Sequence, residues 1–200
     1  NMLSGIYFPD EGEILVEGRP VAIRSPKDAF DHGIGMIHQH FKLIDVFTAA
    51  ENIVLGLHDG SRLDRREIAA KVKEISDRYG FGIDPNKKVY DMSASEKQTV
   101  EIVKVLYRGA DILILDEPSS SLDPISEYEL NHTIASAVGQ QAVLFISHRL
   151  STTRMADRIY MLEHGAVVEE GSHEELMAKD GQYAYMFRIQ AERYQDCLLY

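Results

Sequence analysis

Two short apolar runs, ILIL at residues 112–115 and VLFI at residues 143–146, constrain the possible fold more than any other feature of this sequence. Both runs are continuous and do not alternate apolar with polar residues, which is the pattern of strands covered by helices on both faces. A helix is predicted between them, from about Ile125 to Val138. Strand, helix and strand in this order indicate an α/β fold built on a parallel sheet.

Two amphipathic helices are predicted before ILIL. The stretch from Asp64 to Gly80 opens with an Asp-x-x-Glu capping box, and its apolar face consists of Ile68, Val72, Ile75 and Tyr79. The stretch from Ser93 to Gly109 has an inward face made of Val100, Val103 and either Leu106 or Tyr107. Each helix is predicted to end at its glycine, as many helices do.

Shorter patterns complete the predicted secondary structure. Residues 13–17 and 34–38 have the composition of strands, with a short helix at residues 26–32 between them. Residues 158–163 and 166–171 alternate on either side of a turn and predict a hairpin. The tail from Glu174 onward is predicted to be helical, with Tyr183 and Phe187 as docking side chains and Ile189 as a further candidate.

The composition limits the classes of function. A chain of 200 residues with 44% hydrophobic content can bury one sizeable core, so we expect a single domain over residues 1–200. The net charge of −11, with Lys and Arg scattered among acids, gives no electrostatic footprint for nucleic acid, which we do not expect as a partner. The single cysteine, Cys197, excludes an internal disulfide and fits a reducing compartment. No stretch approaches the roughly 18 apolar residues of a membrane-spanning helix.

Asp116 and Glu117 follow ILIL directly, at the carboxyl end of the predicted strand. Reactive groups collect beyond the carboxyl ends of the strands in open parallel sheets. Because side chains alternate along a strand, one acid is expected to hold a metal ion while the other orients or deprotonates a water. The alternative is a strand that ends in a polar turn, and the acid pair alone does not separate the two interpretations.

The motifs around this pair occur in a characteristic order. Gln39 follows an early predicted strand, a Ser-led helix precedes ILILDEPSSSLDP, and VLFISHR comes about 30 residues later. In this combination the chain resembles, over nearly its whole length, the ATPase subunit of ATP-binding cassette (ABC) transporters. ILILDE resembles the Walker B strand of that family, SSSLD its D-loop, His148 its switch histidine, and residues 35–56 its Q-loop region.

The resemblance implies a fold and a set of residue roles. The fold is an α/β, P-loop NTPase-like parallel sheet core flanked by helices, with a helical subdomain at about residues 46–108, a C-terminal hairpin plus helix, and the N-terminal strands missing. Asp116 would coordinate Mg²⁺, and Gln39 would join the metal or the water. Glu117 would polarise the attacking water, His148 would contact the γ-phosphate of ATP, and Asp123 would cross a dimer interface. These roles suit phosphoryl transfer, which depends mostly on positioning and charge neutralisation.

Residues 92–98, MSASEKQ, resemble the signature sequence of the family, usually Leu-Ser-Gly-Gly-Gln. The resemblance implies that a nucleotide on an opposite subunit is addressed by Ser93, Ala94, Ser95 and Glu96. A helix N-terminus offers amides and a positive dipole end to a phosphate. Ser95 stands where the family has its second glycine, so we expect a weakened signature. Ser93 and Glu96 also form a capping box that any helix can use, and both interpretations can hold together.

A P-loop, G-x-x-x-x-G-K-[ST], is not found, because none of the 14 glycines is followed by lysine. The opening stretch NMLSGIYFPDEGEILVEGRP resembles the second half of the helix that normally follows this loop. We therefore expect residues 1–200 alone to bind ATP weakly or not at all. His38 and His40 face one side of a strand, but two histidines without a third ligand rarely make a metal site.

The chain resembles two branches of the family. Its first hundred or so residues resemble a sugar or nucleoside importer subunit, whereas the segment from Ser147 onward resembles the ATPase end of a peptide or lipid exporter. The leading hypothesis is an ATPase subunit that works with transmembrane transporter subunits and a second ATPase subunit. Its expected location is cytoplasmic and peripheral, at the inner face of the cell membrane. Two alternatives are a non-catalytic partner of another ATPase and an inactive fragment whose unpaired sheet edges promote association.

Overall fold

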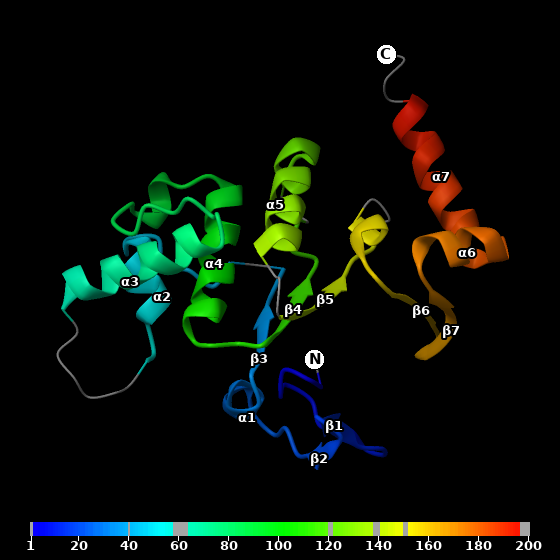
Figure 1. The fold of residues 1–200 in the computed structure, drawn as a ribbon, viewed down its shortest axis with the longest axis horizontal. Helices are drawn as coiled ribbons and strands as arrows, with labels where there is room; N and C mark the ends of the chain where they lie inside the picture. The colour runs from blue at the N-terminus through cyan, green and yellow to red at the C-terminus, as the bar shows by residue number, and fades with distance from the viewer. Residues whose placement is uncertain are drawn as a thin grey trace. The chain divides into compact units, whose positions relative to one another are not determined.

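The computed structural model describes residues 2–39, 41–57, 64–119, 122–137, 141–149 and 152–196 (Figure 1). His40, Cys197 and two serines of the SSSLD stretch lie outside the described residues. The chain divides into two compact units, Asn1–Ile146 and Ser147–Tyr200.

Three parallel strands form the sheet of the first unit, in the order β3 (Ile34–Ile37), β4 (Ile112–Asp116) and β5 (Ala142–Ile146) (Figure 1). Ile37 aligns with Leu115, and Leu115 aligns with Phe145, so the carboxyl ends of the three strands lie at the same edge of the sheet. In β4 the side chains of Leu113, Ile114 and Leu115 are all buried, as a continuous apolar run requires. The predicted α/β fold with a parallel sheet is therefore confirmed.

The prediction that β5 is covered on both faces is wrong for the described structure. Val143 and Phe145 pack against the cluster that contains Leu115 and Leu130. Leu144 and Ile146 lie on the opposite face and are 41% and 42% exposed. Among the described residues, nothing buries this second face of β5.

Two small elements precede β3. The strands β1 (Ile14–Val16) and β2 (Arg19–Val21) pair as an antiparallel hairpin, of which the sequence predicted only the first strand. Helix α1 (Pro26–Asp31) begins after Ser25, whose hydroxyl accepts from the Asp28 N–H at 3.2 Å. The helix therefore has a side-chain cap and a proline at its first position, both of which favour this start.

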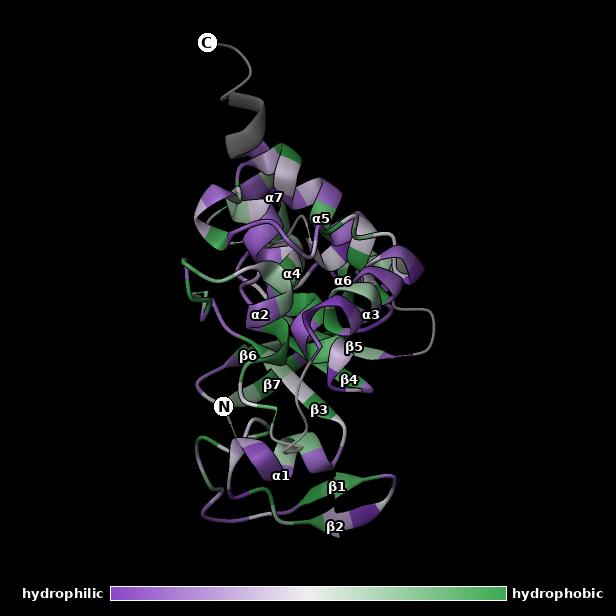
Figure 2. Cartoon of the chain, turned by 90° about the vertical axis from the view of Figure 1, so that its left-hand side faces the viewer, coloured by the Kyte–Doolittle hydropathy of each residue, from purple (hydrophilic) through white to green (hydrophobic). Residues whose placement is uncertain are grey.

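Three α-helices and a 3₁₀ turn pack beside the sheet. They form what we call the helical layer, which consists of α2 (Ala49–Val54), α3 (Arg65–Arg78), the turn η1 (Val89–Asp91) and α4 (Ala94–Tyr107). Its core contains Ile53, Val72, Val89, Val100 and Val103, each of which is fully or almost fully buried. The outer surface of α3 is hydrophilic (Figure 2). At the start of α3, Asp64 accepts from the Arg66 N–H, in place of the predicted reciprocal box with Glu67.

Helix α4 is buried on two faces. Val100 and Val103 belong to the core of the helical layer. Ile102, Val105 and Leu106 belong to the core that contains the buried leucines of β4. A Cβ atom at Gly35 of β3 would lie 2.1 Å from Cγ1 of Val105, so the helix can approach the strand this closely only because residue 35 has no side chain. The narrower inward face predicted from the sequence is part of a larger buried surface.

The second unit contains the turn η2 (Thr152–Met155), the antiparallel hairpin β6 (Ile159–Glu163) and β7 (Ala166–Gly171), and two helices, α6 (His173–Lys179) and α7 (Gln182–Asp196) (Figure 1). The hairpin was predicted. The tail is helical as predicted and consists of two helices, because Asp180 adopts a left-handed conformation with φ of 52° and ends α6. Tyr183 and Phe187 do dock, in a cluster with Ile159 and Leu176.

Candidate functional site

Asp116 and Glu117 lie where the backbone leaves β4. Asp116 is aligned with Ile146 of β5, and the Glu117 N–H donates to the Ile146 carbonyl at 2.9 Å. Glu117 has a φ of 47°, in the left-handed region that a residue with a long side chain rarely adopts. The direction of the Glu117 side chain is therefore set by this turn and not by the alternation along a strand on which the sequence argument relied.

Gln39 joins the acid pair from the neighbouring strand. It follows β3 as Glu117 follows β4, and its Nε2 donates to Oε2 of Glu117 at 3.3 Å. The family resemblance predicts both residues in one site, and the structure brings these two together. Because Gln39 donates through Nε2, its Oε1 is an oxygen ligand of the kind that Mg²⁺ takes.

His38 lies beside this group, and the sequence analysis considered it only as half of a histidine pair. Burial lowers the pKa of His38 below its ordinary value and Lys42 acts in the same direction, while the charges of Asp116 and Glu101 oppose the change. A neutral imidazole at pH 7 presents one donor and one acceptor. Because His38 directly precedes Gln39 in the sequence, it could have been assigned to the same candidate site.

The predicted Mg²⁺ ligands fit that ion by chemistry. Mg²⁺ is usually held by one or two carboxylates together with phosphate oxygens and water, and not by a complete protein cage. Asp116 supplies a carboxylate and Gln39 an amide oxygen at the same sheet edge. Among the described residues there is no group of three or more His, Cys, Asp or Glu side chains that would form such a cage.

Ser93 and Glu96 form a full capping box at the start of α4. The Ser93 hydroxyl accepts from the Glu96 N–H at 3.2 Å, and the Ser93 N–H donates to the Glu96 carboxylate at 2.8 Å. Lys87 donates to the same carboxylate at 2.6 Å, and this contact is the main cause that lowers the pKa of Glu96. The Ser93 N–H is already occupied by the Glu96 carboxylate and is not available to a phosphate, which gives a further reason, besides Ser95, for a weak phosphate site.

Ala94 and Ser95 complete this first turn. Both are half-buried, and Ser95 lines a small cavity of about 130 Å³ together with Glu96, Lys87 and Met92. The carbonyl of Ser95 accepts from the Thr99 hydroxyl at 2.9 Å. The structure thus gives this segment a structural role as a helix start, and a role toward a nucleotide stays a prediction.

Asp123 caps helix α5 (Pro124–Ala137). Its carboxylate accepts from the Ser126 hydroxyl at 2.6 Å and from the backbone N–H groups of Ile125 and Ser126 at 3.0 and 3.1 Å. The Ser126 hydroxyl is the main cause that lowers the pKa of Asp123. A contact that sequence reasoning missed lies nearby, because the buried Ser119 hydroxyl donates to Glu127 at 2.9 Å and ties the segment after β4 to α5.

His148 lies in the second unit, directly after β5, and its side chain is exposed. Its backbone carbonyl accepts from Nε2 of Gln190 on α7 at 2.9 Å. The backbone around His148 is further tied by the Ser147 hydroxyl, which accepts from the Arg149 N–H at 3.0 Å. The structure thus accounts for the backbone of His148, while its predicted contact with a γ-phosphate stays a prediction.

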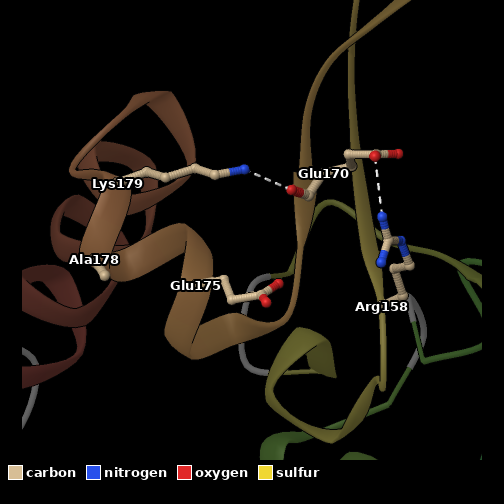
Figure 3. A pocket seen from close by; sticks show the side chains of 5 residues that line it. All are labelled: Arg158, Glu170, Glu175, Ala178 and Lys179. Atoms are coloured by element: carbon tan, nitrogen blue, oxygen red, sulfur yellow. Dashed lines mark hydrogen bonds and ion pairs between the residues drawn. The ribbon is translucent and has the colours of Figure 1, made fainter.

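An open pocket of about 580 Å³ also lies in the second unit and contains none of the predicted site residues (Figure 3). It is lined by Arg158, Glu170, Glu175, Ala178 and Lys179. Arg158 is paired with the Glu170 carboxylate at 2.9 Å, and Lys179 donates to the Glu170 carbonyl at 2.7 Å. Both cations are therefore already engaged, and the pocket is not a strong candidate for an anionic ligand.

Comparisons with known proteins agree with this architecture. The ABC transporter family pattern matches residues 1–120. The chain is 42% identical over 173 residues to the nucleoside import ATP-binding protein NupA of Lactococcus lactis, covering 84% of this chain and 34% of that protein. It is 35% identical over 197 residues to the ATP-dependent lipid A-core flippase of Ralstonia nicotianae, covering 95% of this chain and 33% of that protein.

A solved structure of a bacterial Atm1-family ABC exporter with ATP bound has the same fold, with a TM-score of 0.70 and 31% identity over 94% of this chain and 33% of that one. The chain therefore belongs to the ABC transporter family. Its similar proteins include both importer and exporter subunits, as the two-part resemblance of the sequence predicted. The chain spans about a third of the length of the relatives that it matches. None of the helices in the described ranges is long and apolar enough to span a bilayer.

Proposed function

We propose that this chain belongs to the ATP-hydrolysing module of an ABC transporter and couples ATP hydrolysis to transport across a membrane. The observation that carries the proposal is the hydrogen bond of Gln39 to Glu117, beside Asp116, at the carboxyl ends of two parallel strands in a member of this family. In phosphoryl transfer the protein mainly positions the reacting groups and neutralises the charge on the phosphates. An acid pair and an amide at one sheet edge suit both tasks.

Within this proposal the residues have distinct tasks. Asp116 and Oε1 of Gln39 hold Mg²⁺, which when bound neutralises charge on the phosphate oxygens of ATP. Glu117 orients the attacking water and accepts its proton, while the Gln39 amide fixes the position of the Glu117 carboxylate. His148 contacts the terminal phosphate.

The remaining residues act between subunits. The start of α4, with Ser93, Ala94, Ser95 and Glu96, addresses the nucleotide of a second ATPase subunit, and Asp123 lies at the interface of the two. The partners are that second subunit and the transmembrane subunits of the transporter. The module works in the cytoplasm, peripherally at the inner face of the cell membrane.

The test is a chimera in which residues 1–200 replace the matching segment of the Lactococcus nucleoside import protein, whose remaining sequence supplies the other parts of the module. We expect the chimera to hydrolyse ATP and Glu117→Gln to lower its turnover about 10²–10⁴-fold, the usual contribution of a general base. Binding of Mg-ATP by the variant, measured by calorimetry, controls for folding. A chimera that binds Mg-ATP but turns it over no faster than the Glu117→Gln variant would contradict the proposal.

A second candidate function is a non-catalytic partner, and a specific observation favours it. The start of α4 is exposed and fully formed, with the Ser93 hydroxyl capping the helix, so it can be presented to a nucleotide on another subunit. Such a chain presents Ser93 to the nucleotide of an intact ATPase while its own site is silent. Ser93→Arg should then lower the turnover of a mixed pair with an intact subunit, and an unchanged turnover would count against this function.

A further inference from the structure

Helix α7 contacts the segment that carries His148 at two points. Gln190 donates to the His148 carbonyl at 2.9 Å, and the Tyr183 hydroxyl lies 2.7 Å from the Thr153 hydroxyl. Residues seven apart on a helix are about two turns apart and share one face. One face of α7 therefore holds both ends of the segment from His148 to Thr153.

The base of α7 is itself fixed in place. The carboxylate of Glu169 on β7 accepts from the N–H groups of Gln182 and Tyr183 at 2.7 and 3.1 Å, which satisfies two amides that the first turn of a helix leaves without a partner. A Cβ atom at Gly181 would lie 2.2 Å from Oε1 of Glu169, so a side chain at residue 181 would displace this carboxylate from its present position. The hairpin therefore sets the direction in which α7 leaves it.

Tyr183 strengthens the anchor. Its side chain is 1% exposed, and its hydroxyl lies 2.8 Å from Nδ1 of His173 as well as near Thr153. The ring packs against Phe187, one turn further along the same face and 4.8 Å from the His173 ring. Hairpin, α6 and α7 thus form one packed support, from which Gln190 reaches the His148 backbone.

We propose that Gln190 is a positioning residue, which holds the backbone of His148 through its carbonyl and thereby sets where the exposed imidazole lies. The Gln190 side chain contacts no reacting group in this role. Its effect on turnover rests on the proposed function, in which His148 contacts the terminal phosphate. The effect of Gln190 on the His148 backbone does not depend on the proposed function and can be measured without a nucleotide.

The backbone is tested by nuclear magnetic resonance on isotope-labelled residues 1–200. Gln190→Glu keeps the shape of the side chain but replaces the donor with an acceptor, while Gln190→Lys keeps an N–H donor of similar reach. We expect Gln190→Glu to shift the carbonyl carbon resonance of His148 and to speed exchange of the Arg149 amide about three- to tenfold, the effect of one lost hydrogen bond. Gln190→Lys should restore both. Tyr185→Glu, which adds a charge at an exposed position of α7, should change neither.

Unchanged His148 and Arg149 signals in Gln190→Glu, or changes equal to those of Tyr185→Glu, would overturn the proposal. The effect on catalysis is tested in the chimera, where Gln190→Glu should lower kcat at least threefold with little change in the KM for ATP. A kcat equal to that of the unmodified chimera would overturn the positioning role. If the chimera itself shows no ATPase activity, the proposed function fails, and the resonance data still decide the role of Gln190.

Discussion

Gln39 and Glu117 are 78 residues apart in the sequence, and a hydrogen bond of 3.3 Å joins the Nε2 of Gln39 to the Oε2 of Glu117. The contact links the residues that follow β3 and β4, so it depends on the parallel register of these two strands. The carboxylate is thus held by a neutral donor, which fixes its position without adding a charge beside it.

Gln39→Glu should lower kcat of the chimera further than Gln39→Leu does. Leucine only removes the donor that holds the Glu117 carboxylate, whereas a second carboxylate at residue 39 also repels it. The measurement is kcat of the two variants side by side, with Mg-ATP binding by calorimetry as the control for folding. Equal kcat values of the two variants would contradict the expectation.

Ser93→Ala should destabilise residues 1–200 by about 0.5–2 kcal/mol, because the Ser93 hydroxyl caps α4 through the Glu96 N–H. Urea unfolding followed by circular dichroism measures this change. Ser95→Ala, two residues further on, is the matched control and should change the free energy of unfolding by less than about 0.5 kcal/mol. Equal effects of the two substitutions would show that the cap contributes little.

Gly35→Ala should destabilise the chain by about 1–3 kcal/mol, because the added methyl group meets Cγ1 of Val105. Val105→Ala removes the obstructing methyl groups and leaves a space that the new methyl can use. The double variant should therefore be more stable than the sum of the single changes predicts, by about 0.5–3 kcal/mol. Strict additivity in a urea double-mutant cycle would mean that the strand and helix separate instead.

Glu96 should contribute a pH-dependent part of the stability. Its pKa is lowered from the ordinary value of 4.5, first by the Lys87 hydrogen bond and also by the cap of Ser93. A group with a lowered folded-state pKa contributes stability that is present above its unfolded pKa and is lost as the pH falls through the folded value. Glu96→Gln should therefore flatten the loss of thermal stability below about pH 4.5. Glu67→Gln on the exposed side of α3 serves as the control, and an equal flattening by both would refute the assignment.

Tyr183→Phe should cost about 1–3 kcal/mol although the ring is retained, because it removes both hydrogen bonds of the Tyr183 hydroxyl, to the Thr153 hydroxyl and to Nδ1 of His173. Tyr185→Phe, at a position that is 64% exposed, should be nearly neutral. Thermal unfolding of the three proteins separates these outcomes. A neutral Tyr183→Phe would mean that water replaces the hydroxyl.

The sequence was sufficient for the parts of the fold that depend on local pattern. The runs ILIL and VLFI identified β4 and β5, and the Ser93 box located the start of α4, because burial and capping leave a direct record in residue type. The strand β2 was missed since three residues that include Pro20 carry too little pattern.

Less of the candidate site than of the fold could be predicted from the sequence. Family motifs grouped Gln39 with Glu117, but the left-handed backbone at Glu117 and the burial of His38 depend on neighbours that are distant in the sequence. The pairing of Gln190 with the His148 carbonyl left no mark in the sequence, because a glutamine on a helix is an ordinary surface residue. Such contacts follow from tertiary geometry alone.

Helix α4 contributes Val100 and Val103 to one hydrophobic core and Ile102 and Val105 to the other. If the helical layer moves relative to the sheet, α4 cannot keep its contacts with both cores. A rotation of α2 and α3 relative to the strands that carries α4 along must break the close contact between Gly35 and Val105. A rotation that leaves α4 in place must expose Val100 and Val103 to water. Mechanical force applied to the helical layer is thus transmitted to the sheet through α4, together with Ile75 of α3 and Tyr79 directly after α3, which also pack against the core at the sheet.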